Sequence, residues 1–111
     1  MTIVSMDSDV NNGVLDVVLG GELDFTNVSH IAAGVREAIS VRRPAMVRVD
    51  LAAVTFLDSS GIGALVQVMR AADEISAGFR VENPTSYVLD QLDCAGLLEV
   101  FGLSPDRRDD G

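Results

Sequence analysis

Residues 54–63, with the sequence VTFLDSSGIG, decide the fold, because they lead from an apolar run into the start of a helix. Asp58, Ser59 and Ser60 are all of the residue types that cap helix N-termini. After them, apolar residues recur at helical spacing, at positions Ile62, Leu65, Val66, Met69 and Ala72. This pattern predicts an amphipathic helix that ends near Ala77-Gly78, with Gly78 just beyond its last turn.

The residues before this stretch predict a hairpin, a helix and a central strand. Ile3–Met6 and Val14–Leu19 are the two expected hairpin strands, joined through the turn residues 11–13 and ended by Gly20-Gly21. Thr26 is the expected N-cap of a first helix, which ends at Arg42-Arg43-Pro44. Its apolar face is made of Val28, Ile31, Ala32, Val35 and Ile39, and residues 46–51 alternate as a strand.

Downstream, the pattern predicts a strand at 79–82, a turn at 83–85, a short helix at 87–94 and a last edge strand at 97–101. Helices therefore alternate with strands after the opening hairpin. This order predicts an α/β protein with a mixed sheet. We expect one domain over residues 1–103 and a frayed polar tail at 104–111.

The composition excludes several functional classes. A net charge of −9 leaves no basic surface with which to neutralise phosphates, so we expect neither nucleic-acid nor membrane binding. The chain has no apolar run of the roughly 20 residues that a membrane span needs. It has no basic, apolar leader, and its one cysteine cannot form an internal disulfide. We therefore expect a cytoplasmic protein.

The usual catalytic constellations are missing from the sequence. The chain contains no lysine, which excludes a P-loop, and its single histidine, His30, has no second ligand for a zinc site. A serine triad would need His30 to meet Ser59, and the sequence gives no reason to expect this. Cys94 has no basic neighbour to lower its pKa, so we expect a buried structural thiol. We expect no enzymatic activity, cofactor or metal.

Two interpretations of Ser59 and Ser60 follow from the residues themselves. In the structural one, Asp58 and the serines satisfy the free amides of the helix start, and Gly61 and Gly63 allow close packing. In the functional one, a serine at this position accepts a phosphate. A helix N-terminus stabilises negative charge, and a phosphate adds about −1.5 to −2 charges to the surface. Spacing alone favours the structural interpretation.

Three blocks of sequence resemble the anti-sigma factor antagonists, which are bacterial members of the STAS domain family. Asp58-Ser59-Ser60-Gly61-Ile62-Gly63 is similar to the signature of this family, and Gly21-Glu22-Leu23-Asp24 is similar to its second motif. Leu92, Gly96-Leu97 and Phe101 resemble its C-terminal pattern. The resemblance covers nearly the whole chain, and it implies a mixed sheet of four to five strands packed with three to four helices.

The resemblance also implies a partner-switching function. The unphosphorylated protein would bind an anti-sigma factor that is also a serine kinase, releasing a sigma factor to RNA polymerase. Phosphorylation of Ser59, or as second choice Ser60, would end this binding, and a PP2C-type phosphatase would restore it. Both motifs, Gly21–Asp24 and Asp58–Gly63, would form the docking surface. We expect the free protein to be a monomer.

A second function remains open from the sequence. Some STAS proteins are permanent subunits that dock onto transporter ATPases or other assemblies and are never phosphorylated. A third class, a hydrolase acting through Ser59, would need a base that the motif does not contain.

Overall fold

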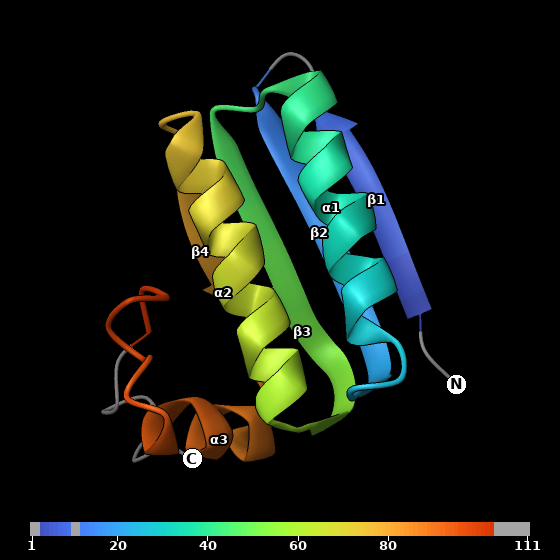
Figure 1. Ribbon diagram of the computed structural model, residues 1–111. Coiled ribbons are helices and arrows are strands. Elements are labelled where there is room, and N and C mark those ends of the chain that lie inside the picture. Colours follow the sequence, from blue (N-terminus) through green and yellow to red (C-terminus); the bar gives the residue numbers. More distant parts are fainter. Residues whose placement is uncertain (1–2, 10–11, 104–111) are drawn as a thin grey trace.

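The computed structural model describes residues 3–9 and 12–103, and this part of the chain forms four strands and three helices (Figure 1). In chain order these are β1 (Ile3–Asp9), β2 (Val14–Leu23), α1 (Val28–Arg42), β3 (Met46–Leu57), α2 (Ser59–Glu74), β4 (Gly78–Glu82) and α3 (Ser86–Cys94). The predicted α/β class is confirmed. The numbers of strands and helices lie at the low end of the ranges that the resemblance implied.

The sheet has the strand order β1-β2-β3-β4 and is mixed. β1 pairs antiparallel with β2, whereas β2, β3 and β4 are parallel to one another. α1 and α2 lie side by side on one face of the sheet, and α3 lies across the end at which these two helices begin (Figure 1). Because β2 and β3 are parallel neighbours, the loops that follow them emerge together at that same end.

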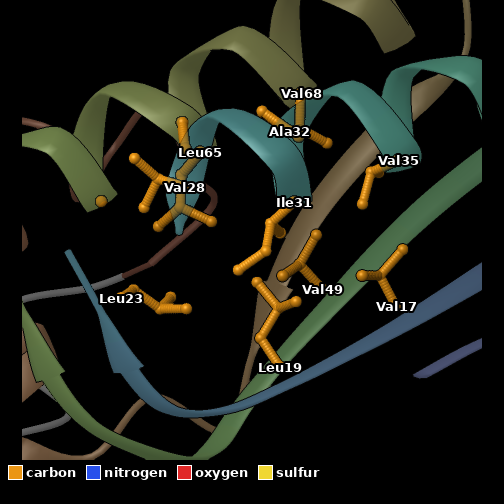
Figure 2. Close-up of a pocket in the computed structure, with 12 residues that line it drawn as sticks. Val17, Leu19, Leu23, Val28, Ile31, Ala32, Val35, Val49, Leu65 and Val68 are labelled. Atoms are coloured by element: carbon orange, nitrogen blue, oxygen red, sulfur yellow. The ribbon is translucent and has the colours of Figure 1, made fainter. Parts of the chain in front are cut away.

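The core fills the space between the sheet and the helix pair. All five apolar residues predicted for α1 are buried. Ile31 and Val35 among them face inward residues of β2 and β3 (Figure 2). A void of about 10 Å³ lies in this layer and is lined only by apolar side chains and Gly61. A water molecule needs about that much room and also polar partners, so we expect the void to be dry.

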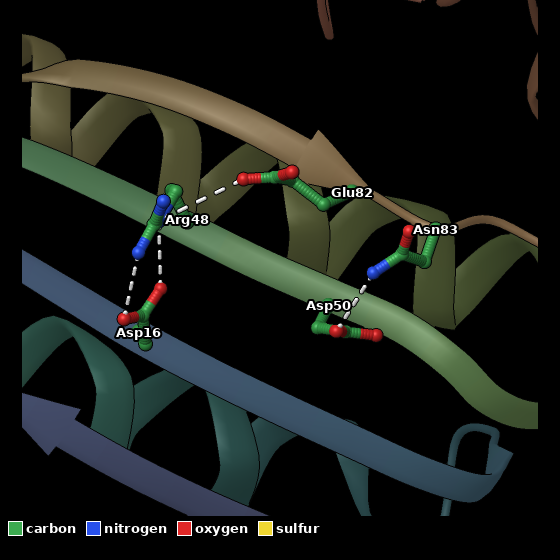
Figure 3. A network of polar contacts seen from close by, with 5 residues as sticks. All are labelled: Asp16, Arg48, Asp50, Glu82 and Asn83. Carbon is green, nitrogen blue, oxygen red and sulfur yellow. Dashed lines mark hydrogen bonds and ion pairs between the residues drawn. The ribbon is translucent and has the colours of Figure 1, made fainter.

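The opposite face of the sheet carries polar side chains and needs no helix to cover it. Arg48 on β3 donates from Nε and Nη2 to the Asp16 carboxylate on β2, at 2.7 and 3.0 Å (Figure 3). Its Nε also lies 3.7 Å from Glu82 Oε1 on β4. Asn83 donates to Asp50 at 3.0 Å. These cross-strand pairs join three strands, while the solvent exposure of Arg48 and Asp16 limits what each pair contributes to stability.

The strands β2 and β3 are longer than predicted. β2 continues through Gly20 and Gly21 to Leu23, because two shifts in its register against β3 absorb the break in the alternation. β3 continues to Leu57, so the apolar run before Asp58 is the second half of a strand. The first hairpin forms, but β1 runs three residues beyond the predicted Met6, to Asp9. Asn11 in its turn and the predicted tail at 104–111 lie outside the described residues.

Three details of the helix ends differ from the predictions. Thr26 is not the N-cap of α1, which is Asn27. α2 ends at Glu74, because Ser76 adopts a positive φ of 59° and its turn is closed by Ala77 donating to Ala72 at 2.9 Å. Gly78 instead begins β4, where a Cβ would lie 2.7 Å from Met46 Cε.

The buried stripe of α2 is rotated relative to the predicted one. Its buried members are Gly61, Leu65, Val68 and Ala72, whereas Ile62, Val66 and Met69 are only half-buried. Because α1 packs against one side of α2, the face that is covered turns toward α1 and includes Val68.

The predicted edge strand at 97–101 is wrong. These residues form turns, in which Phe101 N–H donates to Leu97 and Leu103 N–H donates to Leu98 at 2.8 Å. Leu98, Phe101 and Leu103 are buried, and the ring of Phe101 lies 5.7 Å from that of Phe79 on β4. These two hydrogen bonds close turns along the segment, which the short apolar run did not reveal.

Replacing Phe101→Ala tests whether this segment is an integral part of the core. The side chain is fully buried, so we expect the free energy of unfolding to fall by about 3–5 kcal/mol. Urea denaturation of the two proteins measures the difference. Val100→Ala is the matched control, because Val100 is 51% exposed. A loss for F101A as small as that for V100A would show that the segment does not support the core.

Candidate functional site

Asp58 caps α2 and sets the position of both serines. Its backbone is extended, and its Oδ1 accepts a hydrogen bond from Gly61 N–H at 3.0 Å. Ile62 N–H then donates to the Asp58 carbonyl at 3.0 Å, which starts the regular helical pattern. Ser59 is consequently the first residue of the helix and is exposed, whereas Ser60 is half-buried. The predicted capping role of Asp58 is confirmed.

The loop after β2 lies beside this helix start. Leu23 and Leu57 are paired at the ends of the parallel strands, and Asp58 N–H donates to the Leu23 carbonyl at 3.3 Å. Asp24 and Asp58 are therefore the first residues after two neighbouring strands. The structure thus brings together the two predicted motifs, which are more than thirty residues apart in the chain.

Hydrogen bonds within the loop hold Asp24 in place. Thr26 donates to Asp24 Oδ1 from its hydroxyl and, at 2.9 Å, from its N–H. These two bonds, with the hydroxyl contributing most, lower the pKa of Asp24 below its usual value. Asn27 Oδ1 accepts from Asp24 N–H at 3.2 Å, and its amide donates to the Glu22 carbonyl at 2.8 Å. Thr26 does not cap α1 because it lies one residue before the N-cap, Asn27.

The two glycines of the second motif differ in their surroundings. A Cβ on Gly61 would lie 2.5 Å from Leu57 Cδ1 and 2.8 Å from the Leu23 carbonyl oxygen. Gly61 therefore lets the first turn of α2 pack directly on the ends of β2 and β3. A Cβ on Gly63 would meet no atom within 4 Å. The prediction that both glycines allow close packing is right for Gly61 and wrong for Gly63.

The remaining predicted site residues divide between surface and core. Glu22 is exposed and Gly21 is half-buried with a positive φ of 80°. Ile62 is half-buried, and Leu23 is only 2% exposed. The side chain of Leu23 is therefore part of the core beside the site and is not available to a partner.

Three aromatic residues at this end of the molecule were not singled out from the sequence. Phe25 follows Asp24 and is 75% exposed. Phe56 near the end of β3 stacks with Tyr87 of α3, with ring centroids 6.5 Å apart. The Tyr87 hydroxyl donates to the Leu57 carbonyl at 3.1 Å. The signal available in the sequence was the position of Phe25 directly after Asp24 and of Phe56 two residues before Asp58.

Other residues of chemical interest are placed away from any cluster. His30 lies exposed on α1, and Cys94 is also exposed, so the prediction of a buried thiol is wrong. Cys94 lies on the solvent side of α3, opposite the buried Val88, Leu89 and Leu92. Over residues 3–9 and 12–103, no group of three or more potential metal ligands comes together. No helix of that part is long and apolar enough to cross a membrane.

Gly61→Ala tests whether the close packing of the first turn of α2 leaves no room for a side chain at this position. The added methyl group meets a carbonyl oxygen that cannot move aside, so we expect a loss of about 1–3 kcal/mol in the free energy of unfolding. Gly63→Ala is the matched control, and it should stabilise the protein by up to about 1 kcal/mol, because alanine favours a helix. Urea denaturation measures both. Equal effects of the two variants would contradict the packing assignment.

Thr26→Val tests the origin of the lowered pKa of Asp24. The variant loses the hydroxyl donor, so the pKa of Asp24 should rise toward its usual value. A lowered pKa in the folded state stabilises the fold above the unfolded-state pKa, and this contribution disappears as the pH falls through the folded-state pKa. Carboxyl chemical shifts followed by NMR from pH 7 to pH 2 give both pKa values. Identical titration curves would show that the Thr26 hydroxyl does not act on Asp24.

Comparison with known proteins agrees with this geometry. The family model for the STAS domain matches residues 5–109. The anti-sigma factor antagonist SpoIIAA in its unphosphorylated form is 25% identical, with a TM-score of 0.75 over 86% of this chain and 82% of that one. An anti-sigma factor antagonist from Mycobacterium paratuberculosis is 23% identical, with a TM-score of 0.77 over 98% and 90% of the two chains.

A more distant similarity reaches a different kind of protein. The structure of SLC26A9 matches with a TM-score of 0.61 at 17% identity, over 83% of this chain and 17% of that protein. A search of curated proteins found no match. The family model covers almost the whole chain, and the solved structures share its mixed sheet and helices. The chain is therefore a member of the STAS domain family, and it resembles the anti-sigma factor antagonists within it.

Proposed function

We propose that this protein is an anti-sigma factor antagonist, and that phosphorylation of Ser59 switches it off. The observation that carries the proposal is the placement of Ser59. It is the exposed first residue of α2, directly after the capping Asp58 and beside the loop that contains Asp24. The similarity to SpoIIAA supports this proposal, and that protein has also been solved in a phosphorylated form, which is 24% identical to this chain.

A phosphate on Ser59 is compatible with the fold. The side chain points to solvent, so the phosphate displaces no core residue. The first amides of a helix have no partner within the helix, and the positive end of its dipole favours an anion. The phosphate adds about −1.5 to −2 charges next to Asp58. We therefore expect a change in the binding surface with little change in structure.

Ser60 is the less suitable acceptor. Ser60 is half-buried in the first turn of α2, whereas Ser59 is exposed. A kinase must bring the serine oxygen into line with the phosphate of ATP, which requires access from solvent. The difference in exposure therefore supports Ser59 as first choice and keeps Ser60 as the second.

The proposed partners follow from the resemblance to the anti-sigma factor antagonists. In its unphosphorylated form the protein would bind an anti-sigma factor with serine kinase activity, through the exposed members of Gly21–Asp24 and Asp58–Gly63. Gly63 suits such docking, because nothing stands within 4 Å of its Cβ position and a partner can approach the helix closely. A PP2C-type phosphatase would remove the phosphate. In this cycle the protein is a substrate and a competitor in the cytoplasm, and not an enzyme.

The charge of the site explains how phosphorylation would end binding. Asp24 keeps its negative charge to a lower pH than an ordinary aspartate, because Thr26 donates two hydrogen bonds to it. A partner that accepts this charge and Asp58 would present basic groups. The basic groups would be matched to Asp24 and Asp58, so a phosphate on Ser59 would be buried in the interface without a matching group, and this cost would weaken binding.

Two measurements test this proposal, and the first is intact mass of the protein purified from its native host, with fragmentation to locate any phosphate. We expect one phosphate on Ser59, absent from Ser59→Ala.

The second measurement is the affinity of Ser59→Asp for an anti-sigma factor of the same organism, compared with the affinities of Ser59→Ala and Ser60→Ala. We expect S59D to bind about tenfold or more weakly, because an interface that fits the neutral serine would bury the added carboxylate without a partner.

Other results would redirect the assignment. Phosphate on Ser60 alone would keep the switch and move its site. Equal binding by S59D and S59A, together with no phosphate under any growth condition, would contradict the switch. That result would favour a permanent docking subunit, the second candidate.

A further inference from the structure

The second half of β3 extends past the end of its neighbour β4. The described pairing of the two strands runs from Met46 with Gly78 to Asp50 with Glu82. β3 continues for seven more residues, to Leu57. On the other side, β2 stays paired with β3 as far as Leu23 and Leu57. The strand end that leads to Asp58 and Ser59 therefore has a strand partner on one side only, within the part of the chain that the structure describes.

Tyr87 occupies the other side of this strand end. Its hydroxyl donates to the Leu57 carbonyl at 3.1 Å and lies 3.4 Å from Leu57 N–H, from which it accepts. In a β-strand the N–H and C=O of one residue point to the same edge, where a neighbouring strand would pair with both. A single phenol thus takes the place of that strand at Leu57.

The Tyr87 ring is itself held in place from two directions. It stacks with Phe56, with the ring planes 25° apart. Its backbone lies in the first turn of α3, where the Thr85 hydroxyl accepts from Val88 N–H at 3.2 Å. Val88 and Leu92 are fully buried and anchor the helix. The stacked ring and the anchored helix therefore hold the phenol in position at Leu57.

We propose that Tyr87 is a positioning residue for Ser59, acting through Leu57. This inference rests on the proposed function, because the step that it serves is phosphate transfer to Ser59. Leu57 is followed directly by the cap Asp58, whose N–H is bonded to the Leu23 carbonyl. Tyr87 holds this connection on one side and β2 holds it on the other. A freely moving strand end would present Ser59 in many orientations, and a kinase would have to select among them.

The test compares wild type with Tyr87→Phe, which keeps the ring on Phe56 and removes only the hydroxyl. Ile39→Val is the matched control, because Ile39 is buried near the end of α1 that lies away from Ser59, and the change lowers stability only modestly. Amide hydrogen exchange at Leu57 and Asp58 reports on the strand end. The positioning role of Tyr87 is tested by the rate of phosphate incorporation at Ser59. This rate is measured by mass spectrometry in ATP-supplied extract of the native host.

We expect Y87F to exchange the Leu57 amide faster and to accept phosphate more slowly, each by roughly three- to tenfold, as for the loss of one hydrogen bond. I39V should change neither value, although it lowers the overall stability. A phosphorylation rate for Y87F equal to that of an active wild type would overturn the positioning role alone. An unchanged Leu57 amide would overturn it as well. If wild-type Ser59 accepts no phosphate, the proposed function fails and the positioning role fails with it.

Discussion

The site depends on the contact between the ends of β2 and β3. At this point Leu23 is paired with Leu57, and its carbonyl accepts from Asp58 N–H. The same carbonyl oxygen lies so close to Gly61 that no side chain fits there. The first turn of α2 is thus pressed onto the strand ends. Without this contact the serines would not stand beside the loop of Asp24.

The unequal faces of the sheet explain why function gathers at its end. One face is covered by α1 and α2, and its side chains belong to the core. The other face is occupied by paired charges such as Asp16 with Arg48. Parallel strands place the segments that follow them at one edge of the sheet. In this protein those segments carry the exposed Phe25 and Ser59 beside the half-buried Asp24 and Asp58. The edge therefore differs chemically from the rest of the surface.

Most of the fold could be predicted from the sequence because its signals were local. The face of α1 and the cap at Asp58 follow from periodicity and residue type, and both are confirmed. The errors arose where a distant contact decided the outcome. The C-terminal run became a helical turn because Phe101 packs on Phe79, and Gly78 belongs to a strand because Met46 lies against it. Cys94 is exposed because its helix turns Leu92 inward instead.

The candidate site was predictable as a set of residues but not as an arrangement. The two motifs can be identified from the sequence. Their contact could not be predicted, because it depends on the register of β2 against β3, which includes two shifts. The loops at this contact also satisfy their polar groups differently. The Asp24 carboxylate accepts from Thr26 within its own loop, whereas Asp58 accepts from Gly61 one turn into the helix. Since Asp58 alone provides that side-chain cap, Ser59 is not needed for it, and its exposed hydroxyl is left available for chemistry.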